Sequence, residues 1–191
     1  MSQASSPPED GAAGAFSVRR LRGSDAPAVL EAFGSDPEMI RQGTVPDLAA
    51  AEQYVDRLVT NDAVAAWAIV DAGDRLRGLV AINVDQENRV GWFWYWMHAS
   101  SRRRGVTARA ATAVANWALT EGGLFRLELG HRANNPGSAG VARAAGFIQE
   151  GTERAKFLVG SERVDVLTYG RLASDPWPGS DPLLELRAGG R

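Results

Sequence analysis

Hydrophobic and polar positions follow two different periods along the chain, and the period changes several times between residues 16 and 172. Stretches in which apolar and polar residues alternate, and short runs that are entirely apolar, predict β-strands. Apolar residues three and four positions apart predict amphipathic helices. Strands are expected over residues 16–21, 66–71, 78–84, 89–97, 125–130, 147–159 and 162–172, and helices over about 25–33, 48–60, 103–120 and 136–145. This order predicts an α/β domain with a mixed sheet.

Short polar residues, proline and glycine mark the ends of these elements. Ser24 or Asp25 can cap the first helix, and Asp47 can cap the second. Pro136 suits the first turn of the last helix, and Gly146 suits the position just beyond its end. Turns of two hairpins are expected at Gly73-Asp74 and at Gly160-Ser161.

The strand expected over residues 89–97 is apolar on both faces, which predicts a central position in the sheet. Successive side chains of a strand point to opposite faces, so Trp92, Trp94 and Trp96 share one face. Phe93, Tyr95 and Met97 share the other face. Large aromatics on a central strand usually belong to the core. Those near one end can instead form the wall of a pocket for an apolar or aromatic substrate.

Composition narrows the class of protein. A chain of 191 residues with 45% hydrophobic and 23% charged residues suits one globular domain with a sizeable core. The formal net charge of -2 disfavours a dedicated nucleic-acid binder. Without cysteine there is no disulfide, Cys-zinc site or cysteine nucleophile, and two histidines are too few for a histidine metal site. Because no apolar stretch is long enough to span a membrane and no leader-like segment is recognised, a cytoplasmic protein is expected.

The two ends of the chain differ in composition from the middle. Residues 1–15 are rich in Ser, Pro, Gly and Ala and are expected to be a disordered arm. Residues 16–173 are expected to form the domain, and residues 174–191 a tail rich in Pro and Gly. Trp177 is expected to pin part of that tail to the domain.

Three consecutive arginines, Arg102 to Arg104, stand between the central strand and the next expected helix. A helix N-terminus presents unpaired N–H groups and a partial positive charge, so arginines there are unfavourable unless an anion binds. Gly105 permits a positive φ or the close approach of a ligand to the backbone. The turn therefore suits a phosphate, and the alternative interpretation is a solvated run of charges.

Further motifs follow this turn in a fixed order. The chain contains Tyr95-Trp96, Arg102-Arg-Arg-Gly-Val-Thr107, Arg126-Leu-Glu-Leu129, Asn135-x-x-Ser138, Gly146-Phe147, Glu150-Gly151 and Arg154. In order and spacing this series resembles the GNAT acyltransferase superfamily, and within it the branch of ribosomal-protein N-terminal acetyltransferases. The resemblance covers about residues 16–172. Thr107 holds a position where the superfamily usually has glycine or alanine, and its N–H can still serve a phosphate oxygen.

The resemblance implies a GNAT-like fold: a mixed, mostly antiparallel sheet with flanking helices and a central pair of parallel strands that splay apart. It implies acetyl-CoA, or another acyl-CoA, as the donor in that opening. Backbone groups of Met97 and His98 would bind the pantetheine arm, and the N–H groups from Arg103 to Ala108 would bind the pyrophosphate. Asn135 would contact pantetheine from the other side, and Arg143 would help to hold phosphate. The implied cofactor-binding residues are Met97, His98, Arg103, Arg104, Gly105, Val106, Thr107, Ala108, Asn135 and Arg143.

Amide formation requires a deprotonated amine, a polarised thioester carbonyl and protonation of the leaving thiolate. Ser138 stands where the resemblance places a hydroxyl near the sulfur, so it can donate that proton or simply form a hydrogen bond within the first helical turn. His131 follows the strand 125–130 at the expected opening, and histidine titrates in the range that suits a general base. It can equally be a satisfied histidine at a strand end.

Carboxylates offer further candidates for the base. Glu150 begins the next strand, so it can pair with His131 or accept the amine's proton through water, and Glu128 is a third option. The superfamily commonly places a base carboxylate on the central strand. Tryptophans occupy those positions here, which disfavours a base on that strand.

The sequence leaves the amine acceptor open. The acceptor side is expected from residues 26–60 and the hairpin near Gly160. Acidic residues there suit a cationic amine, or form an ordinary solvated surface: Asp36, Glu38, Asp47 and Glu52. Acetyl is the default acyl group, and succinyl would need a roomier or basic pocket. A protein N-terminus and a small amine both suit the branch. A non-catalytic acyl-CoA-binding module is the alternative function, and neither nucleic acid, metal nor membrane is expected as a partner, whereas a homodimer is compatible with the chain.

Overall fold

The computed structural model describes residues 16–179 and 184–187. Its elements, with η for short 3-10 helices, are β1 (Ser17–Arg20), η1 (Gly23–Asp25), α1 (Ala26–Gly34), η2 (Pro37–Gln42), α2 (Leu48–Val59), β2 (Val64–Val70), β3 (Leu76–Asp85), β4 (Val90–Met97), η3 (Ala99–Ser101), α3 (Val106–Leu119), β5 (Arg126–Arg132), α4 (Pro136–Ala144), β6 (Ile148–Val159), β7 (Glu162–Leu172) and β8 (Leu186–Arg187). Every strand and helix expected from the hydrophobic periods is present. The three 3-10 helices and β8 were not expected.

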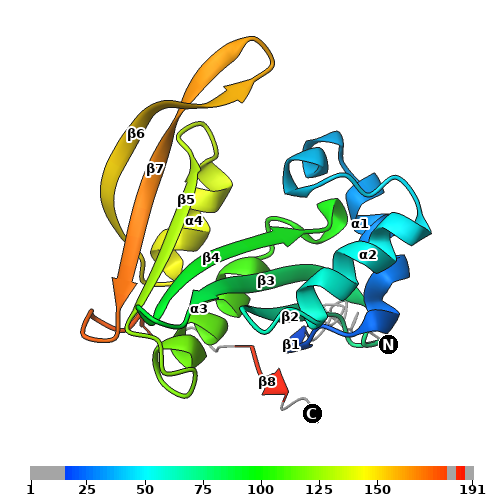
Figure 1. The fold of residues 1–191 in the computed structure, drawn as a ribbon, viewed down its shortest axis with the longest axis horizontal. Helices are drawn as coiled ribbons and strands as arrows, with labels where there is room; N and C mark the ends of the chain where they lie inside the picture. Colours follow the sequence, from blue (N-terminus) through cyan, green and yellow to red (C-terminus); the bar gives the residue numbers. More distant parts are fainter. Residues whose placement is uncertain (1–15, 180–183, 188–191) are drawn as a thin grey trace, which may run out of the picture.

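The strands form one sheet in the order β6-β7-β5-β4-β3-β2-β1-β8. Two neighbouring pairs, β4 with β5 and β1 with β8, are parallel, and the other pairs are antiparallel. In Figure 1 the β6–β7 hairpin extends well beyond the body of the sheet, while β4 and β5 diverge along their length. The expected fold class, a mixed and mostly antiparallel sheet with a central parallel pair, is confirmed.

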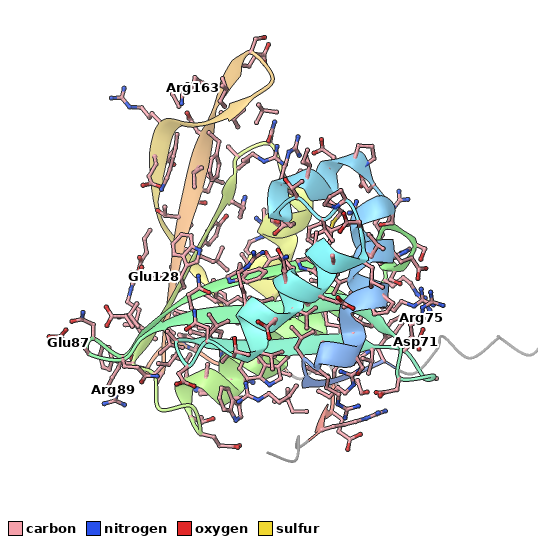
Figure 2. The ribbon with its side chains drawn as sticks, turned by 45° about the vertical axis from the view of Figure 1, so that its right-hand side comes forward. Asp71, Arg75, Glu87, Arg89, Glu128 and Arg163 are labelled. Carbon is pink, nitrogen blue, oxygen red and sulfur yellow. The ribbon has the colours of Figure 1, made fainter. Side chains whose placement is uncertain are left out.

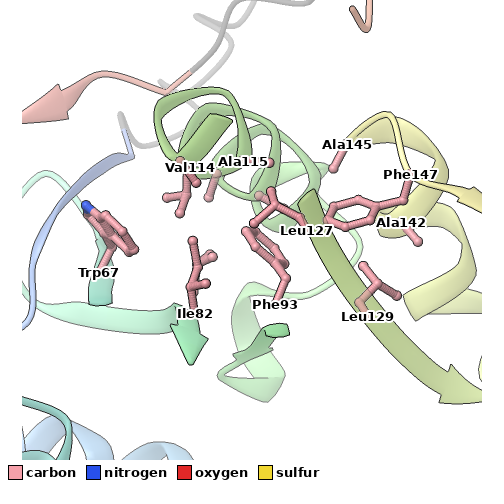
Figure 3. Packing of buried hydrophobic residues seen from close by; sticks show 14 of the residues in the cluster. Trp67, Ile82, Phe93, Val114, Ala115, Leu127, Leu129, Ala142, Ala145 and Phe147 are labelled. Atoms are coloured by element: carbon pink, nitrogen blue, oxygen red, sulfur yellow. The ribbon is translucent and has the colours of Figure 1, made fainter. Parts of the chain in front are cut away.

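Helices cover both faces of the sheet and enclose two hydrophobic clusters. On one face α3 and α4 pack over residues that include Phe93, Leu127 and Phe147 (Figure 3). On the other face α1 and α2 pack over residues that include Trp96 and Leu79. The alternation predicted for β4 is therefore confirmed, because its odd and even positions enter different clusters. Fully burying a side chain such as Phe93 contributes roughly 1.5–3 kcal/mol.

The ends of the helices largely follow the expected signals. The Asp47 carboxylate accepts a hydrogen bond from the Ala50 N–H at 2.8 Å, as predicted. Gly146 has a φ of +78° just after α4, which confirms its predicted role. The expectation for Asp25 is wrong. Its buried carboxylate binds both terminal nitrogens of Arg19 at 2.8 Å instead of capping α1.

Part of the segment expected to be a tail joins the sheet. Trp177 lies under the Arg171 guanidinium, 5.1 Å from the ring centroid, in agreement with the predicted anchoring. Beyond it, Leu184 is buried and β8 pairs in parallel with β1. The arm expected over residues 1–15 lies outside the described residues. Within the part of the chain that is described, no helix is both long and apolar enough to cross a membrane.

Candidate active site

The parallel strands β4 and β5 separate after a short paired segment. Their pairing runs from Val90 opposite Arg126 to Trp92 opposite Glu128 and goes no further along either strand. Beyond this point the two strands enclose space instead of a ladder of hydrogen bonds, as predicted. A first cavity of about 620 Å³ lies between the ends of β4, α3 and α4. A second cavity of about 480 Å³ lies between β4, β5 and the β6–β7 hairpin.

The two cavities share part of their walls, which we call the junction. It consists of the six residues that line both cavities: Arg41, Gln42, Tyr95, Arg132, Asn135 and Ser138. The cavities are therefore adjacent. A two-part ligand, or two ligands that meet end to end, fits this arrangement.

The turn before α3 presents a helix N-terminus to the first cavity. Gly105 has a φ of +70° and precedes the helix, whose first backbone bond runs from the Arg109 N–H to the Gly105 carbonyl. The N–H groups of Val106, Thr107 and Ala108 consequently have no carbonyl partner within the helix. Thr107 and Ala108 line the first cavity, while the side chain of Val106 is buried in the core. This is an anion site built from backbone.

The helix begins three residues later than predicted. Arg103 has a φ of +59° and Gly105 one of +70°, and an α-helix contains neither conformation. Arg103 and Arg104 therefore belong to the turn that leads into α3, where both line the first cavity as expected. Arg104 also lies 5.2 Å from the centre of the Phe16 ring.

Arg102 has a structural role that the sequence did not indicate. Its Nε donates to the Met97 carbonyl at 3.0 Å, and its Nη1 binds the Asp36 carboxylate at the start of η2. Asp36 in turn accepts from the Glu38 N–H at 2.8 Å. Arg102 thus fastens η2 to the end of β4, and η2 contributes to the wall of both cavities.

The backbone groups that β4 directs into the opening belong to Tyr95 and Met97, whereas Met97 and His98 were predicted. The His98 N–H donates to the Arg77 carbonyl of the neighbouring chain segment at 2.8 Å. Because backbone groups alternate in direction along an antiparallel strand, those of Met97 and Tyr95 point toward the opening. The prediction for Met97 is compatible with this geometry, and the prediction for His98 is wrong.

The His98 side chain serves the turn instead of the cavities. Its Nδ1 accepts from the Ser100 N–H at 3.1 Å, and its Nε2 lies 3.7 Å from the Glu31 carboxylate. Partial burial lowers the pKa of His98 in spite of that carboxylate. The neutral imidazole is therefore a cap for η3.

Asn135 and Ser138 lie at the start of α4, within the junction. The Asn135 carboxamide oxygen accepts from the Ser138 N–H at 3.1 Å and so caps the helix. The Tyr95 hydroxyl donates to the Ser138 carbonyl at 3.1 Å, and burial raises the pKa of Tyr95 to about 12. Ser138 and Tyr95 both line the junction, where this hydrogen bond joins them. Arg143 lies exposed near the other end of α4 and lines neither cavity, so its predicted phosphate contact is not supported.

His131 is buried at the end of β5 and lines the second cavity. Its Nδ1 lies 2.9 Å from the Arg132 carbonyl. A carbonyl can only accept, so Nδ1 carries the proton and Nε2 has the free lone pair. Nε2 is buried without a hydrogen-bond partner among the described residues, and the ring stacks on Tyr169 at 5.1 Å. In the neutral ring, this tautomer leaves Nε2 as the nitrogen that can accept a proton.

Glu150 does not lie beside His131, which corrects the predicted pair. The strand next to β5 is β7, and β6, which carries Glu150, lies one strand further away. The Glu150 carboxylate instead binds Arg126, with 2.9 Å between Oε1 and Nη1, and this contact lowers the pKa of Glu150. Glu128 also binds Arg126, at 2.7 Å, and lies toward the closed end of the opening (Figure 2). Neither carboxylate lines a cavity.

The second cavity is mainly aromatic and aliphatic. Trp92 and Trp94 form one wall, and Phe157 and Leu158 of the hairpin form another. This confirms that the hairpin faces the opening. Trp96, in contrast, is a core residue whose Nε1 donates to the Tyr54 hydroxyl at 3.0 Å.

The acidic residues expected near the acceptor have other partners. Asp36 binds Arg102, Asp47 caps α2, and Glu38 pairs with Arg41 and Arg132. Among the described residues no carboxylate lines the second cavity. The acidic residues between positions 26 and 60 therefore do not form an acidic substrate pocket.

Sequence reasoning missed Tyr95, Arg41, Arg132 and η2. Tyr95 was assigned to the apolar face of β4, which is right, but that face also borders the opening. Arg132 follows His131 directly and belongs to β5. No local pattern indicated η2, because its position depends on the distant bond between Arg102 and Asp36.

Comparison with known proteins places this geometry in a family. Residues 16–148 match the model of the acetyltransferase (GNAT) domain. A Bacillus subtilis protein named as a ribosomal N-acetyltransferase, YdaF, is 26% identical over 146 residues, which are 76% of this chain and 75% of that protein. The ribosomal-protein-serine acetyltransferase of Escherichia coli is 29% identical over 100 residues, 52% of this chain and 56% of that protein. Among solved structures, Vibrio cholerae spermidine N-acetyltransferase with CoA and spermine is 18% identical, with a TM-score of 0.74 over 84% of this chain and 96% of that one.

Proposed function

This chain belongs to the GNAT acetyltransferase family and uses acetyl-CoA as its acyl donor, and from that premise we propose that it acetylates a primary amine at the junction of its two cavities. The donor occupies the first cavity and the acceptor the second. The single observation that carries this assignment is the separation of β4 from β5 after Trp92, with a helix N-terminus at one end and an unpaired histidine nitrogen at the other.

The first cavity fits coenzyme A in both chemistry and shape. The N–H groups at the start of α3 and the side chains of Arg103 and Arg104 suit the pyrophosphate. The backbone groups of Met97 and Tyr95 suit the amides of the pantetheine arm, in the manner of an added strand. When bound, the cofactor supplies an activated acyl carbonyl and a thiolate leaving group. The residues of this chain bind it, position the amine and move the protons.

His131 is the proposed general base. Its Nε2 carries the free lone pair, and the Arg132 carbonyl holds the ring in that tautomer. The Arg132 carbonyl thus orients the His131 ring, a role that was expected of the Glu150 carboxylate. Nε2 takes a proton from the acceptor amine. The amine nitrogen can then attack the acyl carbonyl of the donor.

Ser138 is the proposed hydrogen-bond donor to the leaving sulfur, and Tyr95 holds the start of α4 in place through its bond to the Ser138 carbonyl. Both line the junction, and the raised pKa of Tyr95 keeps its hydroxyl protonated at neutral pH. Ser138 keeps its backbone N–H bond to Asn135, so its hydroxyl is a separate group available for this role. A proton accepted by His131 can then pass to the sulfur through the Ser138 hydroxyl.

An amine screen tests the proposed function. Purified protein is incubated with acetyl-CoA and a panel of peptides with free N-termini, polyamines and amino acids, and the release of free CoA is measured together with the mass of the product. Transfer to a primary amine, lost in His131→Gln with coenzyme A affinity retained, is the expected result. Tight coenzyme A binding without transfer to any amine would favour the non-catalytic module instead.

A further inference from the structure

Two arginines from distant parts of the chain meet at the junction. Arg41 comes from η2 and Arg132 from the end of β5, and both line both cavities. Each contacts the same oxygen of Glu38: Arg132 Nη2 lies 3.7 Å from Oε2, and Arg41 Nη1 is paired with it as well. The two guanidinium groups are consequently neighbours.

The charge of this pair is only partly neutralised. Glu38 supplies one negative charge against two positive charges, and Asp36 is already paired with Arg102. Burial and the nearby charge of Arg132 lower the pKa of Arg41, against a smaller opposite effect of Asp36. Glu38 engages one terminal nitrogen of each arginine, and a guanidinium has five N–H donors. Donors therefore remain for an anion.

The remainder of the second cavity is apolar. Trp92, Trp94, Phe157 and Leu158 line it, and apart from His131 its ionisable side chains among the described residues are Arg41, Arg132 and Tyr95. The two arginines share the single carboxylate of Glu38, so their net positive charge opposes a polyamine. They suit a molecule with an apolar body and a negative group close to the reacting atoms.

We propose that Arg41 and Arg132 form a carboxylate-binding subsite that selects a reactant with a carboxylate close to its reacting group. An α-amino acid, or a similar amine with an aromatic or aliphatic body, meets the geometry: the body lies against Trp92 and Trp94, the carboxylate binds the two arginines, and the amine faces His131. The subsite deepens the proposed function and rests on it. The same chemistry can come from an acyl donor with a terminal carboxylate, so the test has an arm for each source.

The acceptor arm measures binding and requires no turnover. Coenzyme A-loaded protein is titrated calorimetrically with N-acetylphenylalanine and with N-acetylphenethylamine, which differ in the carboxylate alone. We expect the carboxylate ligand to bind at least about tenfold more tightly, because hydrogen bonds between a carboxylate and a guanidinium group are charge-assisted. In Arg41→Gln and in Arg132→Gln this preference should fall several-fold, and Arg132→Lys should retain part of it.

The donor arm repeats the titration with succinyl-CoA and acetyl-CoA on the unliganded protein. A preference for succinyl-CoA that both glutamine variants lose, with no preference in the acceptor arm, supports the subsite and assigns the carboxylate to the acyl group. Arg75→Gln is the control, because Arg75 is likewise paired with a glutamate, Glu31, and lines neither cavity. It lies beside Asp71, on the opposite side of the molecule from the hairpin (Figure 2).

Thermal melting of every variant distinguishes a lost subsite from a lost fold. The proposal is overturned when neither arm shows a preference for the carboxylate, or when the preference persists in both folded glutamine variants. A protein that shows the preference but transfers no acyl group in the amine screen would contradict the proposed catalysis and leave the subsite standing. The two proposals therefore fail in different measurements.

Discussion

Gly105→Glu is the sharpest test of the donor site, because it adds a negative charge to the turn at a position with space for the new side chain. Gly105 has a φ of +70°, and a Cβ added there would meet nothing within 4 Å. The substitution therefore causes no steric clash. Its effect on the fold is the cost of a left-handed conformation in an L-residue, roughly 1–2 kcal/mol. In a domain of this size that cost lowers Tm by about 2–8 °C.

The effect on coenzyme A binding is electrostatic. A carboxylate about 6 Å from a phosphate costs ~2.8 kcal/mol at an effective dielectric constant of about 20. Solvent at the open turn reduces this, so we expect at least a tenfold rise in Kd at low salt. At about 1 M salt, where the Debye length is ~3 Å, most of the difference should disappear.

Gly123→Glu is the matched control for this experiment. Gly123 has a φ of +68°, also with nothing within 4 Å of an added Cβ, and it follows the other end of α3. Since α3 rises ~1.5 Å per residue, the control charge lies about 20 Å from the turn. Both variants should lose similar stability in thermal melts, and calorimetry should show weaker coenzyme A binding in Gly105→Glu alone. Equal affinities in the two variants would refute the placement of the pyrophosphate.

Three further predictions concern the chemistry and the fold. His131→Gln should lower kcat by roughly 10²-fold or more, the usual contribution of general base catalysis, while coenzyme A affinity stays the same; an unchanged kcat would exclude this base. Ser138→Ala should lower kcat by about tenfold, the effect of one lost hydrogen bond in the transition state. The helix cap should remain, because Asn135 accepts from the backbone N–H of Ser138; an unaffected rate would leave Ser138 with a structural role. A hydrogen bond from Arg19 lowers the pKa of Asp74, so this carboxylate stabilises the fold above the unfolded pKa of about 3.9 and ceases to do so as the pH falls through the folded value. Asp74→Asn should therefore have a lower Tm than the parent protein at pH 7, with the gap closing as the pH falls below the unfolded pKa of about 3.9; a gap independent of pH would contradict this linkage.

Local signals in the sequence were sufficient for the strands and helices and for the turn before α3. The alternation of aromatics along β4 predicted a central strand with two buried faces, and both faces enter hydrophobic clusters. Gly105 predicted a turn with positive φ, and Asp47 and Gly146 predicted helix ends. Each of these features depends on neighbours within a few residues, which a sequence displays directly.

The errors arose where the outcome depends on the pairing of distant segments. His131 and Glu150 were expected to meet because β6 follows β5 after one helix, but β7 occupies the place between them. Glu150 instead reaches Arg126 across Gly170, where a Cβ would lie 2.4 Å from the Glu150 carboxylate. His98 was misassigned for a similar reason, because its N–H is used by β3. Strand order and register are tertiary properties that short motifs do not specify.

The acceptor half of the site is specific to this chain because side chains from separate elements build it. In the proposed function the donor is held mainly by backbone groups at the start of α3 and the edge of β4, and many sequences can present those groups. The second cavity depends on Trp92 and Trp94, on the β6–β7 hairpin and on Arg41, which η2 brings to Arg132. The Arg102–Asp36 bond links the two halves, since it fastens η2 to the strand that also faces the donor. Breaking that bond should consequently disturb both cavities, because η2 lines each of them.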